Sequence, residues 1–389
     1  MTLKALIISL FLSGNTLARV APIKSPSDNY KVKVRIAHGL KNVEVSGTDL
    51  TRYLHPVDQS KTYGGRKKVK FNCHYFSKDN KKVSNQILLA SLTSGTGLVT
   101  FDKKKYQGEL HVVTSGRNKK SCDVVNELEM DSYISSLLAK EMNASWPIEA
   151  LKAQAVAART YALHKIQKAK LLDSSFYDLE NSEKHQVNGD FFDVTRRTLK
   201  AARLTSGFVL KNKLGKLTPA FFHASCGGRT LRPDEVWSNK VVGYEKVANC
   251  NYCKKKDNWQ SVISRSRLKK IISWAMRKGY ITKKLNLDKK IRIYKDKRNR
   301  KFLNIKVGSR KIKLKKAFFR RYFGRVQFPS NYFYLADGLG KGPVHFVGKG
   351  NGHGVGLCQV GSRGLALKGW DYKRILSHYF PELNIKKIY

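Results

Sequence analysis

The chain has 389 residues, of which 76 are lysine or arginine and 28 are aspartate or glutamate, so its formal net charge is +48. A hydrophobic content of 41% with 11% aromatic residues is typical of a globular protein and excludes an intrinsically disordered chain. A surface this basic would bind polyanions, whether nucleic acid, acidic lipid headgroups or an acidic polysaccharide.

The first residues have the pattern of a secretory signal peptide. Met1–Lys4 is short and basic, Ala5–Leu12 is apolar, and Thr16 and Ala18 have the small-residue spacing of a cleavage site. We therefore predict that residues 1–18 are removed on export to the periplasm or cell wall, which argues against nucleic acid as the natural partner. No later stretch approaches about 18 uncharged apolar residues, so we expect no transmembrane segment after cleavage.

Residues 19–120 are predicted to form a β-rich region. Apolar and polar residues alternate with the period of a strand at 31–38, 43–47, 86–92, 98–101 and 108–114. The basic runs 66–70 and 103–105 are predicted to be solvent-exposed sheet edges. Cys73 and Cys122 stand apart from the other cysteines, and we predict a disulfide between them because an exported chain with six cysteines permits one.

Residues 131–165 are predicted to form two helices joined by a short turn, with Glu141 at the joint. Apolar residues of the first helix recur at helical spacing, and Glu141 falls on or beside their face. Pro147 suits the first turn of the second helix, which is rich in alanine. A carboxylate directed inward at a helix end can have the raised pKa that a general acid requires, whereas a solvated or capping glutamate is the ordinary alternative.

The next part of the chain is predicted to mix helices and strands. We expect a helix at 193–205 and a hairpin formed by residues 207–212 and 216–225. Residues 254–340 form a basic segment, insert-like and poor in motifs, with a predicted helix at 264–278 and three strands after it.

The C-terminal part is dense in glycine. Glycines at alternate positions of the loop 348–356 permit backbone conformations that other residues forbid. The loop leads into a predicted helix that carries Gln359, and an amphipathic helix follows at 372–379. His353 within the loop is either structural or a functional side chain.

Three stretches, in this order, resemble the SpoIID/LytB family. They are AKEMNASWPIEALKAQAVAARTYAL (139–163), FFHASCGGRT (221–230) and GNGHGVGLCQVGSRGLALKG (350–369). The resemblance covers roughly residues 126–389, and we therefore expect a catalytic region at 121–389. We predict an α+β fold with a β-rich N-terminal part, a central helical pair that carries the glutamate, and a β-rich C-terminal part whose glycine-rich loop closes a groove.

The resemblance also implies an activity. Members of the family are lytic transglycosylases that cut peptidoglycan glycan strands, preferentially strands whose stem peptides an amidase has removed. At the position of their single acid/base stands Glu141. One carboxyl can suffice, where hydrolases usually need two, because the 6-hydroxyl of the muramic acid attacks its own anomeric carbon and gives a 1,6-anhydro product. The alternative is a non-catalytic wall-binding protein that enhances an N-acetylmuramyl-L-alanine amidase.

Further residues stand at motif positions of the family and could line the groove. They are Lys152, Gln154, Arg159, Tyr161, Gln186, His223, His353 and Gln359. For Lys152 and Arg159, pairing with structural acids such as Glu149 is an equal alternative. The basic charge suits a peptide-free strand, because its exposed lactyl carboxylates make it a polyanion.

The predicted chemistry requires no cofactor, although two metal sites can be considered. Some relatives carry zinc near the glutamate on a Cys–Thr…His–Cys–Gln pattern, but only His185 could ligate in the matching stretch here, so we do not expect that site. Separately, Cys226, Cys250, Cys253 and Cys358 could gather near the cleft. A Cys-x-x-Cys pair with two further thiols suits a structural tetrahedral zinc, and two disulfides are an equal alternative in an oxidising compartment.

Overall fold

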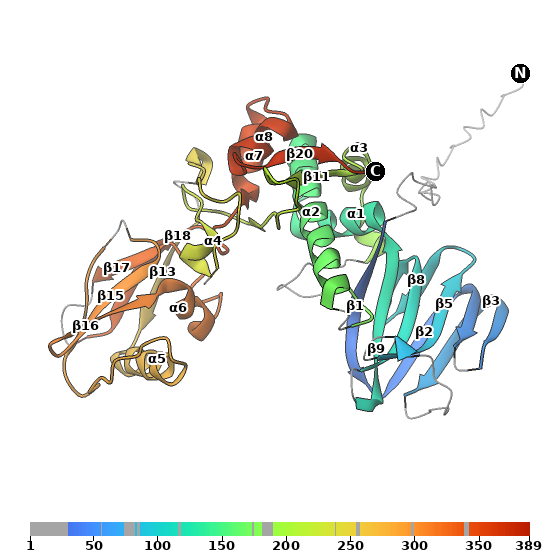
Figure 1. The fold of residues 1–389 in the computed structure, drawn as a ribbon, viewed down its shortest axis with the longest axis horizontal. Helices are drawn as coiled ribbons and strands as arrows, with labels where there is room; N and C mark the ends of the chain where they lie inside the picture. Colours follow the sequence, from blue (N-terminus) through green and yellow to red (C-terminus); the bar gives the residue numbers. More distant parts are fainter. Residues whose placement is uncertain are drawn as a thin grey trace, which may run out of the picture.

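The computed structural model describes most of the chain beyond its N-terminus. The described residues are 30–55, 57–73, 82–83, 86–115, 118–172, 175–180, 190–237, 239–253, 257–296, 299–337 and 342–389. The predicted signal peptide lies outside them. Figure 1 shows a sheet formed by the N-terminal strands, a central group of helices that includes α7 (Gln359–Leu367) and α8 (Tyr372–Tyr379), and a second β-rich part formed by residues 257–349, so the fold is α+β as predicted. Within the described residues, no helix combines the length and apolar character needed to cross a membrane.

The N-terminal part is a ten-stranded sheet in the order β10-β1-β9-β8-β5-β2-β6-β7, with β3 paired to β2 and β4 to β5. The strands are β1 (Lys31–Leu40), β2 (Asn42–Leu54), β3 (Gln59–Asn72), β4 (Lys82–Val83), β5 (Gln86–Ser94), β6 (Leu98–Phe101), β7 (Lys104–Gln107), β8 (Glu109–Ser115), β9 (Asn118–Glu129) and β10 (Leu179–Glu180). The five strands predicted from alternation are all present. The basic runs lie on the edge strand β3 and at the edge strand β7, as expected, and the Cys73–Cys122 disulfide is confirmed.

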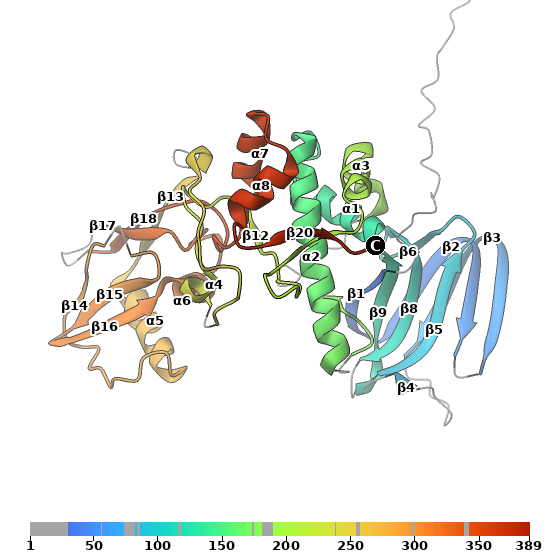
Figure 2. The same cartoon turned by 45° about the horizontal axis from the view of Figure 1, so that its top comes forward.

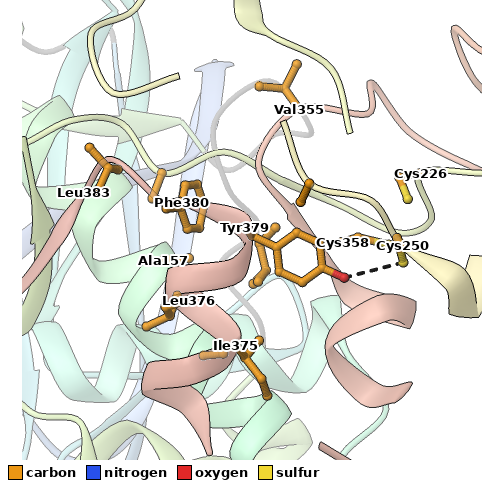
Figure 3. Packing of buried hydrophobic residues seen from close by; sticks show 14 of the residues in the cluster. Ala157, Cys226, Cys250, Val355, Cys358, Ile375, Leu376, Tyr379, Phe380 and Leu383 are labelled. Carbon is orange, nitrogen blue, oxygen red and sulfur yellow. Dashed lines mark hydrogen bonds between the residues drawn. The ribbon is translucent and has the colours of Figure 1, made fainter. Parts of the chain in front are cut away.

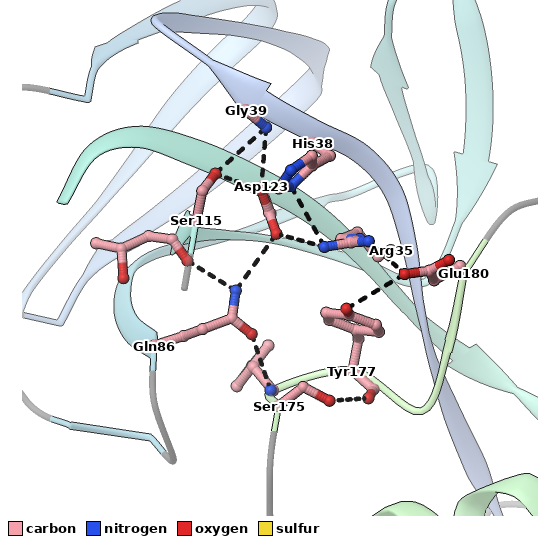
Figure 4. Close-up of polar contacts among 11 residues, drawn as sticks. Arg35, His38, Gly39, Gln86, Ser115, Asp123, Ser175, Tyr177 and Glu180 are labelled. Carbon is pink, nitrogen blue, oxygen red and sulfur yellow. Dashed lines mark hydrogen bonds and ion pairs between the residues drawn. The ribbon is translucent and has the colours of Figure 1, made fainter. Parts of the chain in front are cut away.

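A buried carboxylate, that of Asp123 in β9, ties β10 to this sheet (Figure 4). Asp123 accepts hydrogen bonds from Ser115 and, at 3.1 Å, from Arg35 of β1. Arg35 also pairs with Glu180 of β10, and its guanidinium lies 4.4 Å from the centroid of the Tyr177 ring. These contacts hold β10 parallel to β1, on the side of the sheet where the helices begin.

The helical pair is present as predicted, with α1 (Met130–Glu141) followed by α2 (Ile148–Leu172). Helix α2 is buried on two faces. Ala150, Ala158 and neighbouring residues pack in a cluster with α1, β1 and α3 (Arg196–Leu204). Ala153 and Ala157 pack in a second cluster with the C-terminal elements. Alanine suits both faces because its short side chain lets elements approach on two sides of one helix.

The C-terminal elements return to α2 (Figure 2). Strand β11 (Phe208–Lys211) pairs with β20 (Asn384–Lys387), and β12 (Phe222–His223) pairs in parallel with β19 (Leu357–Cys358). Helices α7 (Gln359–Leu367) and α8 (Tyr372–Tyr379) then pack on α2. Helix α8 has its predicted bounds, and α7 carries Gln359 as predicted. The short elements η1 (Phe191–Asp193) and α4 (Pro233–Val236) complete this part.

The predicted hairpin between residues 207–212 and 216–225 is wrong. Only Lys211 and Leu217 form a bridge, and the two strands pair instead with C-terminal partners. Pro219 has no N–H to donate to a ladder, which explains why the second strand does not continue alongside the first.

Between Cys253 and Asn351 the chain forms a unit with its own hydrophobic core, here called the basic unit (residues 257–349). It contains two three-stranded sheets and two helices, namely β13 (Asn258–Ile263), α5 (Arg265–Arg277), β14 (Ile291–Ile293), β15 (Phe302–Val307), β16 (Arg310–Lys315), α6 (Lys316–Phe323), β17 (Phe333–Asp337) and β18 (Val344–Lys349). The helix and three strands predicted here are present. The first strand of the basic unit pairs with its last strand, beginning with Asn258 opposite Lys349. The two ends of the unit therefore lie side by side, at a position here called its root.

Candidate functional site

Glu141 is the last residue of α1 and is partly buried at the joint with α2. The helix ends there because the next residue, Met142, is extended, with φ −136°, and buries its side chain. The turn that follows is held from outside by Arg197 of α3. Its guanidinium donates to the carbonyl oxygens of Ala144 at 2.9 Å and Trp146 at 2.7 Å. This role of Arg197 has no signal in the sequence, since α3 meets the turn only in the folded chain.

The carboxyl of Glu141 has a perturbed pKa. Burial raises this pKa above its ordinary value, and the nearby side-chain amide of Gln359 opposes the shift. Gln359 is the first residue of α7 and is itself buried, and its Nε2, near the Glu141 carboxyl, has no other hydrogen-bond partner among the described residues. The structure therefore places two predicted site residues next to each other. Their polar groups are only partly satisfied by the protein, which is the situation of groups that await a ligand.

A series of aromatic rings connects α2 to the glycine-rich loop. The ring centroid of Tyr161 lies 6.0 Å from that of Phe221, which lies 4.7 Å from that of Trp237. Trp237 in turn is 5.1 Å from His353. Burial, and after it the charges of Tyr161 and Glu141, raise the pKa of the buried Tyr133. Burial raises the pKa of Tyr161 itself to about 12, so its hydroxyl stays protonated.

Both predicted histidines are held neutral. His223 donates from Nδ1 to the carbonyl of Val355 at 3.0 Å, and burial lowers its pKa to about 4. His353 accepts at Nδ1 from the Val355 N–H at 3.0 Å, and burial lowers its pKa well below the ordinary value. The rings lie 5.5 Å apart, and the Nε2 of His223 is buried without a hydrogen-bond partner among the described residues.

The glycine-rich loop makes this arrangement possible. Gly352 has φ 107°, in the region that favours glycine, and a Cβ atom there would lie 2.7 Å from the Cβ of His223. Asn331 of the basic unit donates to the carbonyl of His353 at 3.1 Å, while its buried Oδ1 lacks a partner among the described residues. Asn331 was not among the predicted site residues, although it lies in the FPSNYF stretch that precedes the loop.

Two predicted binding residues have structural partners instead. Lys152 pairs with Glu149 at 2.7 Å, and Glu149 also accepts from the N–H of Tyr372 at the start of α8. Arg159 is fully buried, pairs with Asp131 at 2.8 Å and donates to backbone carbonyls around the end of α3. Their surroundings correspond to the structural alternative, and neither has a part in the function proposed below.

The remaining predicted residues are placed as follows. Gln154 of α2 is fully buried, and neither atom of its amide has a hydrogen-bond partner among the described residues. Gln186 and His185 lie outside the described residues. The four cysteines Cys226, Cys250, Cys253 and Cys358 do gather, with their sulfur atoms all within 4.8 Å of one another.

Comparison with known proteins agrees with the motifs. A family model described as stage II sporulation protein, SpoIID, matches residues 118–211, which include Glu141 and both helices of the pair. An uncharacterized protein of Brachyspira hyodysenteriae is 35% identical over 264 residues, which cover 67% of this chain and 68% of that protein. The chain belongs to the SpoIID/LytB family.

Two named relatives of this SpoIID/LytB protein are more distant. It is 27% identical over 294 residues to the amidase enhancer of Bacillus subtilis, covering 64% of this chain but only 39% of the enhancer. It is 22% identical over 275 residues to the stage II sporulation protein D of Bacillus amyloliquefaciens, covering 68% of this chain and 76% of that protein.

Proposed function

We propose that this protein is an exported lytic transglycosylase that cleaves peptide-free glycan strands of peptidoglycan, with Glu141 as its single acid and base. Membership of the SpoIID/LytB family supports a cell-wall-related role. The observation that carries the proposal is the environment of Glu141. Its carboxyl lies at the joint of the helical pair with a pKa raised by burial, next to the buried amide of Gln359.

The raised pKa favours the first step. A carboxyl with a raised pKa keeps its proton to a higher pH than an ordinary glutamate does, and it can give that proton to the glycosidic oxygen as the bond from that oxygen to the anomeric carbon breaks. The resulting carboxylate then takes the proton of the 6-hydroxyl, whose oxygen forms the new bond to the same anomeric carbon. The products are a strand with a new terminal hydroxyl and a 1,6-anhydromuramyl end, and the glutamic acid is regenerated.

The aromatic series that runs from α2 to the glycine-rich loop suits a sugar strand. Aromatic side chains such as Tyr161 and Trp237 offer apolar faces against which pyranose rings pack, and the neutral His223 offers a buried nitrogen lone pair for a hydroxyl. None of these groups adds a second carboxylate, as intramolecular attack requires none.

The charge supports the peptide-free substrate. The basic unit holds 27 lysines and arginines against four aspartates and glutamates. A strand without stem peptides exposes a lactyl carboxylate on each muramic acid, and a strongly positive surface raises the local concentration of such a polyanion. In strands that keep their peptides, each lactyl carboxyl is blocked as an amide.

A non-catalytic role as an amidase enhancer is the second candidate, and the relative of that name supports it. The two roles differ in Glu141. A protein that only binds the wall and stimulates an N-acetylmuramyl-L-alanine amidase does not need a carboxyl with a raised pKa at the helical joint, and a glutamine would serve as well.

The deciding experiment uses sacculi treated with an amidase and untreated sacculi. The wild type, Glu141→Gln and the exposed control Glu44→Gln are incubated with each, and the soluble fragments are examined by mass spectrometry. We expect 1,6-anhydromuramyl fragments from treated sacculi with the wild type and the control, and none with Glu141→Gln. An absence of anhydro product with the wild type would reject the enzyme. In that case the protein and Glu141→Gln would be tested with an added amidase, and equal stimulation by both would support the enhancer role.

A further inference from the structure

Four cysteines from three separate parts of the sequence meet beneath α7. Cys226 follows β12, Cys250 precedes the short 3-10 helix η2 (Asn251–Cys253), Cys253 ends it, and Cys358 precedes α7. All four are described and buried, and none is disulfide-bonded. The Cys253 sulfur lies 3.3 Å from that of Cys250 and 3.3 Å from that of Cys358 (Figure 3 shows three of the four).

We propose that Cys226, Cys250, Cys253 and Cys358 bind one structural zinc ion. Sulfur atoms about 2.3 Å from a zinc ion at tetrahedral angles lie about 3.8 Å from one another. The observed separations, from 3.3 Å up to at most 4.8 Å, bracket this spacing. Disulfide sulfurs are about 2.05 Å apart, so neither 3.3 Å pair is a bond, and one sulfur, that of Cys253, is equally near two others. A set of four converging sulfurs fits one metal better than two separate bridges.

The protein also supplies donors to the sulfurs, as thiolates bound to zinc require. The N–H of Gly361, in the first turn of α7, donates to the Cys358 sulfur at 3.4 Å. The hydroxyl of Tyr379 in α8 donates to the Cys250 sulfur at 3.5 Å (Figure 3). The positive end of the α7 dipole faces the same group. These contacts disperse the negative charge that four thiolates leave around a divalent ion.

Two glycines of α7 make room for the cluster. A Cβ atom at Gly361 would lie 1.9 Å from the Tyr379 hydroxyl and 2.6 Å from the Cys250 sulfur. A Cβ atom at Gly364 would lie 2.3 Å from the ring of Tyr252, between the two cysteines of the Cys-x-x-Cys pair. Because these two positions are glycine, α7 can pack directly against the turn that carries Cys250 and Cys253.

The position of the cluster indicates what the metal would do. Cys253 is the last residue of η2 before the chain enters the basic unit, and Cys358 lies shortly after the chain leaves it. Cys226 lies beside the returning chain, where Ser225 and Asn351 exchange backbone hydrogen bonds at 2.9 and 2.8 Å. A zinc ion at this point would fasten the root of the basic unit to α7, and so fix the position of Gln359, the residue after Cys358.

One other group of potential ligands does not support a site. Glu109, His111 and Glu127 also lie within reach of a common ion. Their groups already satisfy one another, since His111 contacts Glu127 at 3.0 Å and Glu127 has Lys33 at 3.7 Å as a second partner. Only the cysteine cluster, among the described residues, combines burial with a ligand set that is selective for zinc.

The first test is a metal and thiol count on full-length protein secreted by its host and purified without chelator. We expect close to one zinc per chain by atomic emission, and four thiols that react only after denaturation with a chelator present. Cys73 and Cys122 should react only after reduction. Less than about 0.1 zinc per chain, with all six cysteines unreactive until reduced, would overturn the proposal in favour of disulfides.

A second test reads the ligands directly. Replacement of zinc by cobalt should give the intense charge-transfer and visible absorption bands of a cobalt ion bound tetrahedrally by four thiolates. Cys253→His should retain the metal with a shifted spectrum, because imidazole can replace a thiolate, whereas Cys253→Ser should lose at least about tenfold in affinity. A weak octahedral cobalt spectrum in the wild type would contradict the proposal even if every cysteine variant failed to fold. Neither test depends on glycan cleavage, so the zinc and the proposed activity can fail separately.

Discussion

Gln359 lies beside Glu141, although one begins the seventh helix near the C-terminus and the other ends the first. The contact exists because α7 packs on α2, the partner of α1, and because β19 leads directly from the glycine-rich loop into α7. The family motifs around the two residues thus describe one place in the fold. Burial at this place also makes the ionisation of Glu141 measurable through stability, because it shifts the pKa of the folded state.

We predict that Glu141→Gln changes the pH dependence of stability. Burial raises the pKa of Glu141 above 4.5, so the folded chain holds a proton that the unfolded chain releases. The wild type should therefore lose stability as the pH rises from about 4.5 through the raised pKa, and the variant should lack this loss. The difference in Tm between variant and wild type should grow across this window in a pH series by calorimetry. A constant difference would show that Glu141 ionises normally.

Arg159→Met should destabilise the fold strongly, because it leaves the Asp131 carboxylate buried without its charge partner. We expect a loss of about 3–5 kcal/mol in the free energy of unfolding. Lys152→Met is the matched control, since its pair with Glu149 is partly exposed and should contribute about 1 kcal/mol or less. Urea denaturation followed by circular dichroism measures both. Equal losses in the two variants would contradict the structural role of Arg159.

The two nitrogens of His223 can be tested separately. His223→Asn keeps an amide N–H near the position of Nδ1, where it can still donate to Val355, but removes the unpaired Nε2. His223→Gln keeps a polar group near the position of Nε2 and removes the donor to Val355. If Nε2 contacts the glycan, His223→Asn should keep its Tm within a few degrees and lose about tenfold or more in kcat/KM, since a factor of ten is about 1.4 kcal/mol. Unchanged kinetics for His223→Asn would assign His223 to structure alone.

Gly361→Ala should destabilise the protein, although alanine is the better helix former. Its Cβ atom would collide with the Tyr379 hydroxyl and the Cys250 sulfur, and such overpacking costs about 1–3 kcal/mol. Gly64→Ala in β3 is the control, because nothing lies within 4 Å of its added Cβ, and we expect a change within about 0.5 kcal/mol. Thermal unfolding compares them. A Gly361→Ala variant as stable as Gly64→Ala would mean that α7 can move away from the cysteine turn.

Binding to amidase-treated sacculi should weaken steeply with salt. The screening length falls from about 10 Å at 0.1 M to about 3 Å at 1 M, which removes the attraction between the basic unit and a polyanionic strand. Co-sedimentation of Glu141→Gln, which should bind without cutting, measures this against untreated sacculi. Replacement of the exposed Lys289 and Lys290 by glutamine should shift the curve to lower salt. A salt-independent preference for treated sacculi would locate the selectivity in uncharged contacts.

Local patterns predicted most of the elements. The helical pair, α3, α5, α7 and α8 follow from apolar spacing, and alternation located five strands of the N-terminal sheet and three strands of the basic unit. These predictions succeeded because each depends on residues a few positions apart. The hairpin after α3 failed for the converse reason. Local sequence marks β11 and β12 as extended, but their partners, β20 and β19, lie near the other end of the chain.

Glu141 and the four cysteines could be selected from the sequence alone, because a motif and a Cys-x-x-Cys spacing identify them by residue type. Their environments could not. The pKa of Glu141 depends on how much of α1 the C-terminal elements cover. Arg159 has a structural role and Gln359 lies beside Glu141 because of the neighbours that α3 and α7 provide. Residue type and spacing thus determined the chemistry available to this protein. Packing between distant segments decided which of those residues are structural and which face the proposed site, because burial and pairing arise only when the segments meet.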